Sequence, residues 1–181
     1  MKTRRVFNTP GHAHELTFSC YHRLPLLNRD RTRLWLVESL GRIRSSYDVD
    51  LIAYVIMPEH AHVLIRPRQP DYQIELISKS FKQSVARRAL AHLRENSPAF
   101  LERLAGERNG RRLRYHFWQP GGGYDRNVFN AEPLTKWIDY LHGNPVRRRL
   151  VAHPTDWRWS SARAYAGLDD VPLTMDRIAM P

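Results

Sequence analysis

Cysteine and lysine are scarce in this chain of 181 residues, and long apolar runs are missing from it. One cysteine, Cys20, excludes an intrachain disulfide and a cysteine-rich zinc site, and it favours a reducing compartment. No apolar stretch approaches the roughly 20 residues of a membrane span, and none follows the basic N-terminus to form a secretion signal. We therefore expect a cytoplasmic protein without a membrane-embedded part.

The charge of the chain is strongly positive, and arginine carries most of it. There are 29 Lys+Arg against 18 Asp+Glu, which gives a formal net charge of +11. Only 4 of the cations are lysines and the other 25 are arginines. A guanidinium matches the geometry of phosphate oxygens, so this balance indicates a polyanionic partner, with nucleic acid first. A high-GC genome would explain the ratio of arginine to lysine, but it would not explain the net charge.

Hydrophobic periodicity predicts one domain over residues 1–181, with a C-terminal tail from about residue 150 that packs back on it through Trp157, Trp159 and Tyr165. The predicted order β-α-β-β-α-β, followed by a helix, fits a ferredoxin-like split βαβ sandwich, an α+β fold with an antiparallel sheet. Residues 96–114 read as a mobile loop or an extended arm. Strands are expected at 14–21, 51–57, 60–66 and within 115–128, and helices at 30–46, 72–94 and 130–142.

The two longer helices have predicted core faces. In residues 30–46, Leu34 and Val37 are expected on the buried side, with Leu40 and Ile43 as further candidates. Residues 72–94 carry one apolar stripe with a polar, basic face opposite to it. The stripe is Ile74, Ile77, Phe81 and Val85, and the opposite face is Lys79, Gln83 and Arg87.

Two histidines, His60 and His62, lie one residue apart on a predicted strand, so both imidazoles point to the same face. Such a pair can share a metal ion, and the alternative is a pair of unrelated hydrogen-bonded histidines. The apolar run before the pair and the turn at Pro58 favour a rigid internal strand. A second pair, His12 and His14, reads as a surface feature or a minor nucleic-acid contact, and it remains a rival metal pair.

The last predicted helix places Tyr140 outside its own apolar stripe, roughly 110° from the centre of that stripe. Asn130 is a candidate N-cap, and Pro145 is expected to end the helix. Asn144 follows Tyr140 by one turn and Lys136 precedes it by one turn. Without further evidence, Tyr140 reads as a partly exposed tyrosine beside a helix end. The stripe is Leu134, Trp137, Ile138 and Leu141, and the arginines that follow are Arg147, Arg148 and Arg149, either a solvated charge run or a phosphate grip.

Four segments stand out along the chain: residues 54–62 (YVIMPEHAH), 117–120 (FWQP), 139–146 (DYLHGNPV) and 156–161 (DWRWSS). Together they resemble the single-tyrosine transposases of the IS200/IS605 type, which are HUH endonucleases, and most of all the REP-associated tyrosine transposases. They occur in the order of that family and span most of the chain.

The resemblance implies a metal-dependent DNA-cutting site. His60, His62 and Asn144 correspond to the metal ligands, and Tyr140 to the nucleophile, with Tyr124 as the next candidate if Tyr140 is not. A nitrogen and oxygen donor set without thiolate suits Mg²⁺ or Mn²⁺, although histidine also binds Zn²⁺. Attack by the tyrosine would give a 5′-phosphotyrosine and a free 3′-hydroxyl, so rejoining would need no ATP.

The expected substrate is single-stranded or hairpin DNA in a bacterial, nucleoid-associated cytoplasm. Two other functions stay open: a nucleic-acid-binding protein of the same fold that does not cut, and a small basic protein with a structural metal site. A homodimer is possible and a monomer is not excluded. The expected DNA contacts are Lys79, Lys82, Gln83, Arg87, Lys136, Arg147, Arg148 and Arg149.

Overall fold

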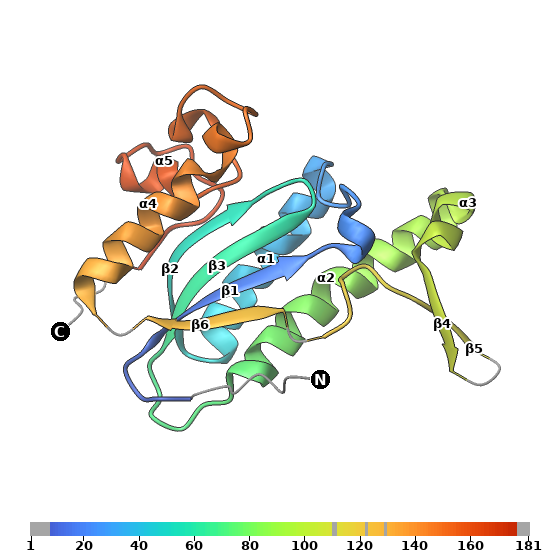
Figure 1. Ribbon diagram of the computed structural model, residues 1–181, viewed down its shortest axis with the longest axis horizontal. Helices are drawn as coiled ribbons and strands as arrows, with labels where there is room; N and C mark the ends of the chain where they lie inside the picture. Colours follow the sequence, from blue (N-terminus) through green and yellow to red (C-terminus); the bar gives the residue numbers. More distant parts are fainter. Residues whose placement is uncertain (1–7, 110–111, 122, 129, 177–181) are drawn as a thin grey trace.

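A four-stranded antiparallel sheet in the order β2-β3-β1-β6 forms the centre of the protein (Figure 1). The structure is a computed structural model, and it describes residues 8–109, 112–121, 123–128 and 130–176. The α+β fold with its antiparallel, ferredoxin-like sheet is thus confirmed. The strands of the sheet are β1 (Ala13–Ser19), β2 (Val49–Ile56), β3 (His60–Pro67) and β6 (Tyr124–Val128), and the long helices are α1 (Asp30–Ser46), α2 (Ile74–Asn96) and α4 (Ala131–Arg147).

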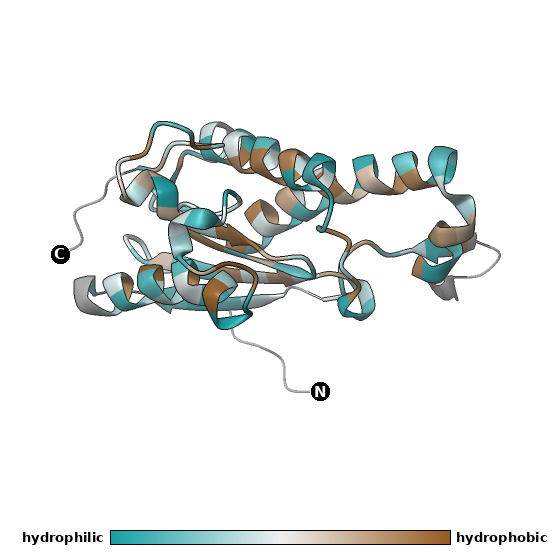
Figure 2. Cartoon of the chain, turned by 90° about the horizontal axis from the view of Figure 1, so that it is seen from above, coloured by the Kyte–Doolittle hydropathy of each residue, from teal (hydrophilic) through white to brown (hydrophobic). Residues whose placement is uncertain are grey.

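Helices lie on both faces of the sheet, with α1 and α2 on one face and α4 on the β2 side of the other (Figures 1 and 2). One face packs against α1 and α2 through a core that includes Phe18, Ala61 and Phe81. The other face packs against α4 through a smaller cluster that includes Val55 and Leu141. Because side chains alternate along a strand, β1, β2 and β3 contribute to both clusters.

The predicted core face of α2 is confirmed, and that of α1 is wrong at one position. The stripe of α2 is buried throughout, with no member more than 2% exposed. In α1, however, Leu34 is 48% exposed, while Leu36 is fully buried. Residues 33, 36, 37, 40 and 43 of α1 are buried and follow a helical spacing, and position 34 lies outside that stripe.

The segment predicted as a loop or an arm is an arm with regular structure. It contains the short helix α3 (Pro98–Leu101), a 3-10 turn (Glu102–Leu104), and the hairpin of β4 (Ala105–Asn109) and β5 (Arg112–Tyr115). Figure 1 shows this hairpin beyond the end of α2, away from the central sheet.

The C-terminal segment runs along the outer edge of β2. Main-chain hydrogen bonds join Ile56 N to Trp159 O at 2.8 Å, Ser161 N to Tyr54 O at 2.9 Å and Asp176 N to Leu51 O at 2.9 Å. The segment includes a 3-10 turn (Pro154–Asp156) and α5 (Ala162–Tyr165). These bonds occupy backbone groups that an edge strand would otherwise leave open to another chain.

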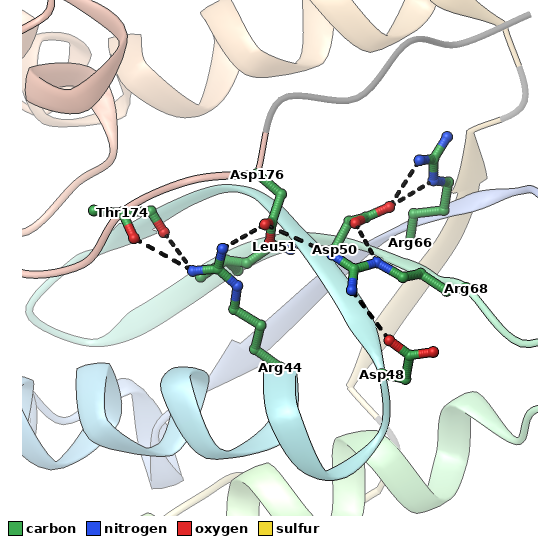
Figure 3. A network of polar contacts seen from close by, with 8 residues as sticks. All are labelled: Arg44, Asp48, Asp50, Leu51, Arg66, Arg68, Thr174 and Asp176. Atoms are coloured by element: carbon green, nitrogen blue, oxygen red, sulfur yellow. Dashed lines mark hydrogen bonds and ion pairs between the residues drawn. The ribbon is translucent and has the colours of Figure 1, made fainter.

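A network of charged side chains fastens the end of this segment (Figure 3). The Asp176 carboxylate accepts a hydrogen bond from Leu51 N at 2.9 Å and pairs with Arg44. The neighbouring buried carboxylate of Asp50 accepts from Arg66 and Arg68, each at 2.7 Å.

In the part of the chain that the structure describes, no helix is long and apolar enough to cross a membrane.

Candidate active site

His60 and His62 lie at the beginning of β3, on the face of the sheet that α4 covers. Their ring centroids are 4.9 Å apart and their planes are nearly perpendicular, at 88°. Ala61 between them is fully buried in the core on the opposite face. The alternation expected from the sequence therefore places both imidazoles together.

Glu15 and Thr17 of β1 orient the ring of His62. Thr17 is directly opposite His62 in the β1–β3 register. The Nδ1 atom of His62 lies 3.0 Å from Glu15 Oε1 and 2.8 Å from Thr17 Oγ1, and the Thr17 hydroxyl donates to Glu15 Oε1 at 3.0 Å. With Nδ1–H donating to this buried carboxylate, Nε2 is left as an unprotonated nitrogen that can bind a metal.

Glu15 and Thr17 are not among the predicted site residues, although the sequence of the strand carries a signal for them. Polar side chains stand at every second position of this strand, at Glu15, Thr17 and Ser19, between apolar ones. Glu15 is only 2% exposed. A buried carboxylate needs a partner, and the strand register supplies His62 as that partner.

His60 is neutral at physiological pH and has an uncommitted nitrogen. Burial, and next the neighbouring His62, lower the pKa of His60 to about 4. Within the described residues its Nδ1 has no hydrogen bond, although Glu59 Oε1 lies 3.3 Å away at ion-pair distance. Arg148, directly after α4, approaches the same Glu59 oxygen at 2.9 Å, so charged groups from the strand turn and from the end of the helix meet beside His60.

Tyr140 of α4 reaches this site from the covering helix. It is 43% exposed, as its position outside the apolar stripe predicts. The centroid of its ring lies 6.2 Å from that of His62, and Trp137 contacts it from the preceding turn at 5.4 Å. One chain thus brings an exposed phenol close to the paired imidazoles.

Arg147 lies over the ring of Tyr140, with Cζ 4.3 Å from the centroid. Its guanidinium also donates to the main-chain oxygen of Tyr140. The missing side chain of Gly143 leaves room for the Arg147 side chain to lie along the helix, because a Cβ at position 143 would lie 2.6 Å from Arg147 Nη1. Arg147 is predicted from the sequence as a DNA contact, and its contact with Tyr140 is not predicted.

Asn144 is buried, and its side chain makes hydrogen bonds that stabilise α4 where the helix continues through Pro145. The prediction that Pro145 ends the helix is wrong, since α4 continues to Arg147. Proline removes the N–H that would bond Leu141 O. The Asn144 amide nitrogen donates to Leu141 O at 3.4 Å and to Tyr140 O at 3.1 Å, which satisfies the orphaned carbonyl.

This use of the nitrogen leaves the Asn144 oxygen, the better metal ligand, without a hydrogen bond among the described residues. At the other end of α4, Asn130 occupies the N-cap position but makes no side-chain capping bond.

The rival pair His12 and His14 is not arranged for a metal. His14 is fully buried, so its interpretation as a surface residue is wrong. Its Nδ1 lies 2.8 Å from Asp125 Oδ1 and its Nε2 lies 2.7 Å from the Tyr72 hydroxyl, so both ring nitrogens have partners. No group of three or more His, Cys, Asp or Glu side chains in the described ranges is arranged to hold a metal ion. A site at His60 and His62 therefore needs a ligand of another type, such as Asn144.

The expected DNA contacts divide between two sides of the molecule. Arg147 and Arg148 lie at the site. Lys136 and Arg149 are exposed at other positions of α4 and directly after it. The exposed residues of α2 belong to the helical layer on the opposite face of the sheet, and Lys82 there donates to Gly121 O at 2.6 Å. Those α2 residues are Lys79, Gln83 and Arg87.

Tyr124, the reserve nucleophile, is 40% exposed on β6 and pairs with Thr17 across the strands. Because paired residues point to the same face, Tyr124 shares the face of His62.

Known proteins resemble this chain in sequence and in fold. The family model described as "Transposase IS200 like" matches residues 9–143. A curated Haemophilus influenzae protein, whose name places it among the REP-associated tyrosine transposases, is 23% identical over 143 residues, which is 74% of each chain. A solved structure of a REP-associated tyrosine transposase bound to a REP hairpin superposes with a TM-score of 0.68 at 19% identity, covering 99% of this chain and 95% of the other.

A paired-histidine strand facing a tyrosine helix on this fold defines a HUH-type tyrosine transposase, a class of DNA endonuclease. The chain belongs to the IS200-like transposase family. The family resemblance seen in the sequence is confirmed.

Proposed function

We propose that this protein cuts and rejoins single-stranded or hairpin DNA through a covalent bond to Tyr140. The observation that carries the proposal is the approach of the exposed Tyr140 ring to His62, at 6.2 Å between centroids in the same chain. We propose that Tyr140 acts at the histidines of its own chain, so that a monomer would suffice for the reaction. A homodimer is compatible with this arrangement.

Transposases of this kind generally use a divalent metal ion. His60, His62 and Asn144 fit such an ion, Mg²⁺ or Mn²⁺, because each offers a donor atom that the protein leaves uncommitted. Those atoms are a nitrogen of the neutral His60, Nε2 of His62 and Oδ1 of Asn144. A bound divalent cation supplies Lewis-acid polarisation of the scissile phosphodiester.

The proposed reaction exchanges one phosphodiester bond for another and needs no further reactant. The Tyr140 oxygen forms a bond to phosphorus, the bond from phosphorus to the 3′-oxygen breaks, and the 3′-oxygen leaves as a hydroxyl. Water takes up the phenolic proton and returns a proton to the leaving 3′-oxygen. The 5′-phosphotyrosine conserves the phosphodiester bond, so attack by a 3′-hydroxyl reverses the step and rejoins the strand.

Neighbouring residues position these groups. Glu15 and Thr17 hold the ring of His62, and Arg147 packs over the Tyr140 ring. Arg147 at the Tyr140 ring and Arg148 at Glu59 would contact the phosphates on either side of the cut. The basic side chains of α2 would serve a distant part of the DNA, since they lie on the other side of the sheet.

We propose hairpin DNA as the substrate because a structural relative carries a REP hairpin. The net charge of +11 supports an anionic partner and a place in the bacterial cytoplasm at the nucleoid. Equal or tighter binding of a duplex of the same sequence, at fixed salt, would contradict this choice.

The deciding experiment incubates the protein with labelled hairpin DNA and Mn²⁺ and looks for a protein–DNA adduct that survives denaturation. Tyr140→Phe should abolish the adduct while hairpin affinity changes less than twofold. Tyr124→Phe is the matched control and should retain the adduct. An adduct that persists in Tyr140→Phe would show that another nucleophile acts.

A protein that binds without cutting is the second candidate. The basic α2 surface, which lies away from the histidines, favours it. Tight hairpin binding by the wild type with no adduct in Mg²⁺, Mn²⁺ or Zn²⁺ would establish this function instead.

A further inference from the structure

A groove of about 740 Å³ lies where the beginning of α1 meets the end of α2 and the short helix α3. None of the residues that line it belongs to the candidate active site. One wall is the segment around Leu26, and Leu27 N of this segment donates to Pro58 O at 2.9 Å, in the turn that precedes His60. The groove and the active site are therefore at the same end of the sheet.

The lining combines aromatic surface with polar atoms. Trp35 is half-buried in the groove and lies against His92, with ring centroids 6.1 Å apart. Leu26, Leu93 and Phe100 extend the apolar surface. The polar lining residues are Asn28, Thr32, His92 and Ser97. A flat aromatic ring beside hydrogen-bonding groups suits a nucleobase, which stacks on its face and bonds at its edge.

Positive charge is concentrated at the rim. Arg29 and Arg31 line the groove and are exposed, and neither has an acidic partner among the described residues. Arg31 lies 5.8 Å from the centroid of Trp35. Arg88 lies closer to the same ring, at 5.1 Å, but it pairs with Glu38. Two cations next to an aromatic surface thus stay available for phosphate.

We propose that this groove binds an unpaired nucleotide of the DNA substrate, with the base on Trp35 and the adjoining phosphate at Arg29 and Arg31. The proposal rests on the proposed function, since it takes the same DNA as its ligand. The unpaired arginines at the rim and the net charge of +11 favour a nucleotide over an apolar peptide.

The test measures affinity at fixed salt, with a chelator present, for three labelled hairpins: blunt, with a flank of unpaired thymines, and with the same flank made abasic. The wild type should bind the thymine flank about tenfold more tightly than the abasic flank, a typical gain for one stacked base. Trp35→Ala should abolish this difference and change blunt-hairpin affinity less than twofold.

Trp35→Phe keeps an aromatic face and should retain most of the difference. Tyr165→Ala removes an exposed aromatic outside the groove and should retain all of it. The groove is not the binding site if the wild type shows no difference, if Trp35→Ala keeps the difference, or if Trp35→Ala weakens all three hairpins equally. An apolar peptide as the natural occupant likewise predicts no base-dependent difference.

Photo-crosslinking covers the case in which Trp35→Ala does not fold. A 5-iodouracil in the flank should crosslink the wild type within residues 25–35 or 89–100, and crosslinks found only elsewhere would overturn the proposal. The adduct at Tyr140, assayed on the blunt hairpin with Mn²⁺, is scored separately. If the wild type forms no adduct but still binds the thymine flank more tightly than the abasic flank, the catalytic proposal is rejected and the proposal for the groove stands.

Discussion

Gly143 occupies a position in α4 where alanine would favour the helix by about 1 kcal/mol. A Cβ there would lie 2.6 Å from Arg147 Nη1, the mobile end of a long side chain. Gly143→Ala should therefore keep or raise the melting temperature but displace Arg147 from Tyr140, and it should slow adduct formation about tenfold or more. Thermal melts and single-turnover adduct assays measure the two effects.

Gly41→Ala in α1 is the matched control, because its Cβ would meet only Leu173 at an ordinary 3.9 Å. It should gain the same helix stability with no change in rate. An unchanged adduct rate in Gly143→Ala would show that Arg147 does not position Tyr140.

Glu15 acts on the metal site through His62. Glu15→Gln keeps the size of the side chain but loses the carboxylate that accepts from His62 Nδ1, so the apparent affinity for Mn²⁺ should fall about 10- to 100-fold. The Mn²⁺ dependence of adduct formation gives this affinity. Asp125→Asn removes the carboxylate that pairs with His14 on the opposite face of the sheet, and it should leave the Mn²⁺ dependence unchanged. Equal Mn²⁺ affinity in Glu15→Gln and the wild type would refute this role.

At the scale of elements, α4 shows how a side chain overrides a local rule. Proline normally ends a helix because it lacks an N–H and clashes with the preceding turn. In α4 the Asn144 amide bonds the carbonyl that Pro145 leaves open, and Arg147 bonds Tyr140 O. The helix therefore extends to Arg147 instead of ending before Pro145, and Asn144 remains on the helix that carries Tyr140.

The stability that the contact between α4 and the C-terminal segment contributes should depend on pH. His142 is buried, with Nε2 2.8 Å from Ser161 Oγ, and burial lowers its pKa to about 4 from 6.5. The folded state thus disfavours the proton, so stability is complete above pH 6.5 and falls as the pH drops towards 4, by up to about 3 kcal/mol for this group.

Urea unfolding between pH 4 and 7, with chelator present, measures this loss. His60 has the same shift and contributes in the same window. His142→Gln should remove roughly half of the histidine-dependent loss, and a variant with the pH dependence of the wild type would contradict the assignment.

At the scale of the whole molecule, the C-terminal segment depends on a few polar contacts with β2 and α1. Asp176→Ala removes the bond to Leu51 N and the pair with Arg44, and it should lower the free energy of unfolding by about 1–3 kcal/mol. Chemical denaturation measures the change. Asp169→Ala, an exposed carboxylate of the same segment, is the control and should change stability by less than about 0.5 kcal/mol. Equal stabilities for the two variants would show that the network does not fasten the segment.

Local periodicity alone determined the long helices, the strands of the central sheet and the common face of His60 and His62, because a strand alternates and a helix repeats every 3.6 residues wherever it lies in the chain. Only the tertiary structure decided the partners of these residues. Strand register brings Glu15 to His62 across 47 positions, and it ties His14 to Asp125 across 111. Layer packing likewise put the basic face of α2 on the far side of the sheet. Such pairings depend on which surfaces bury each other, and a repeat along one segment carries no information about that choice.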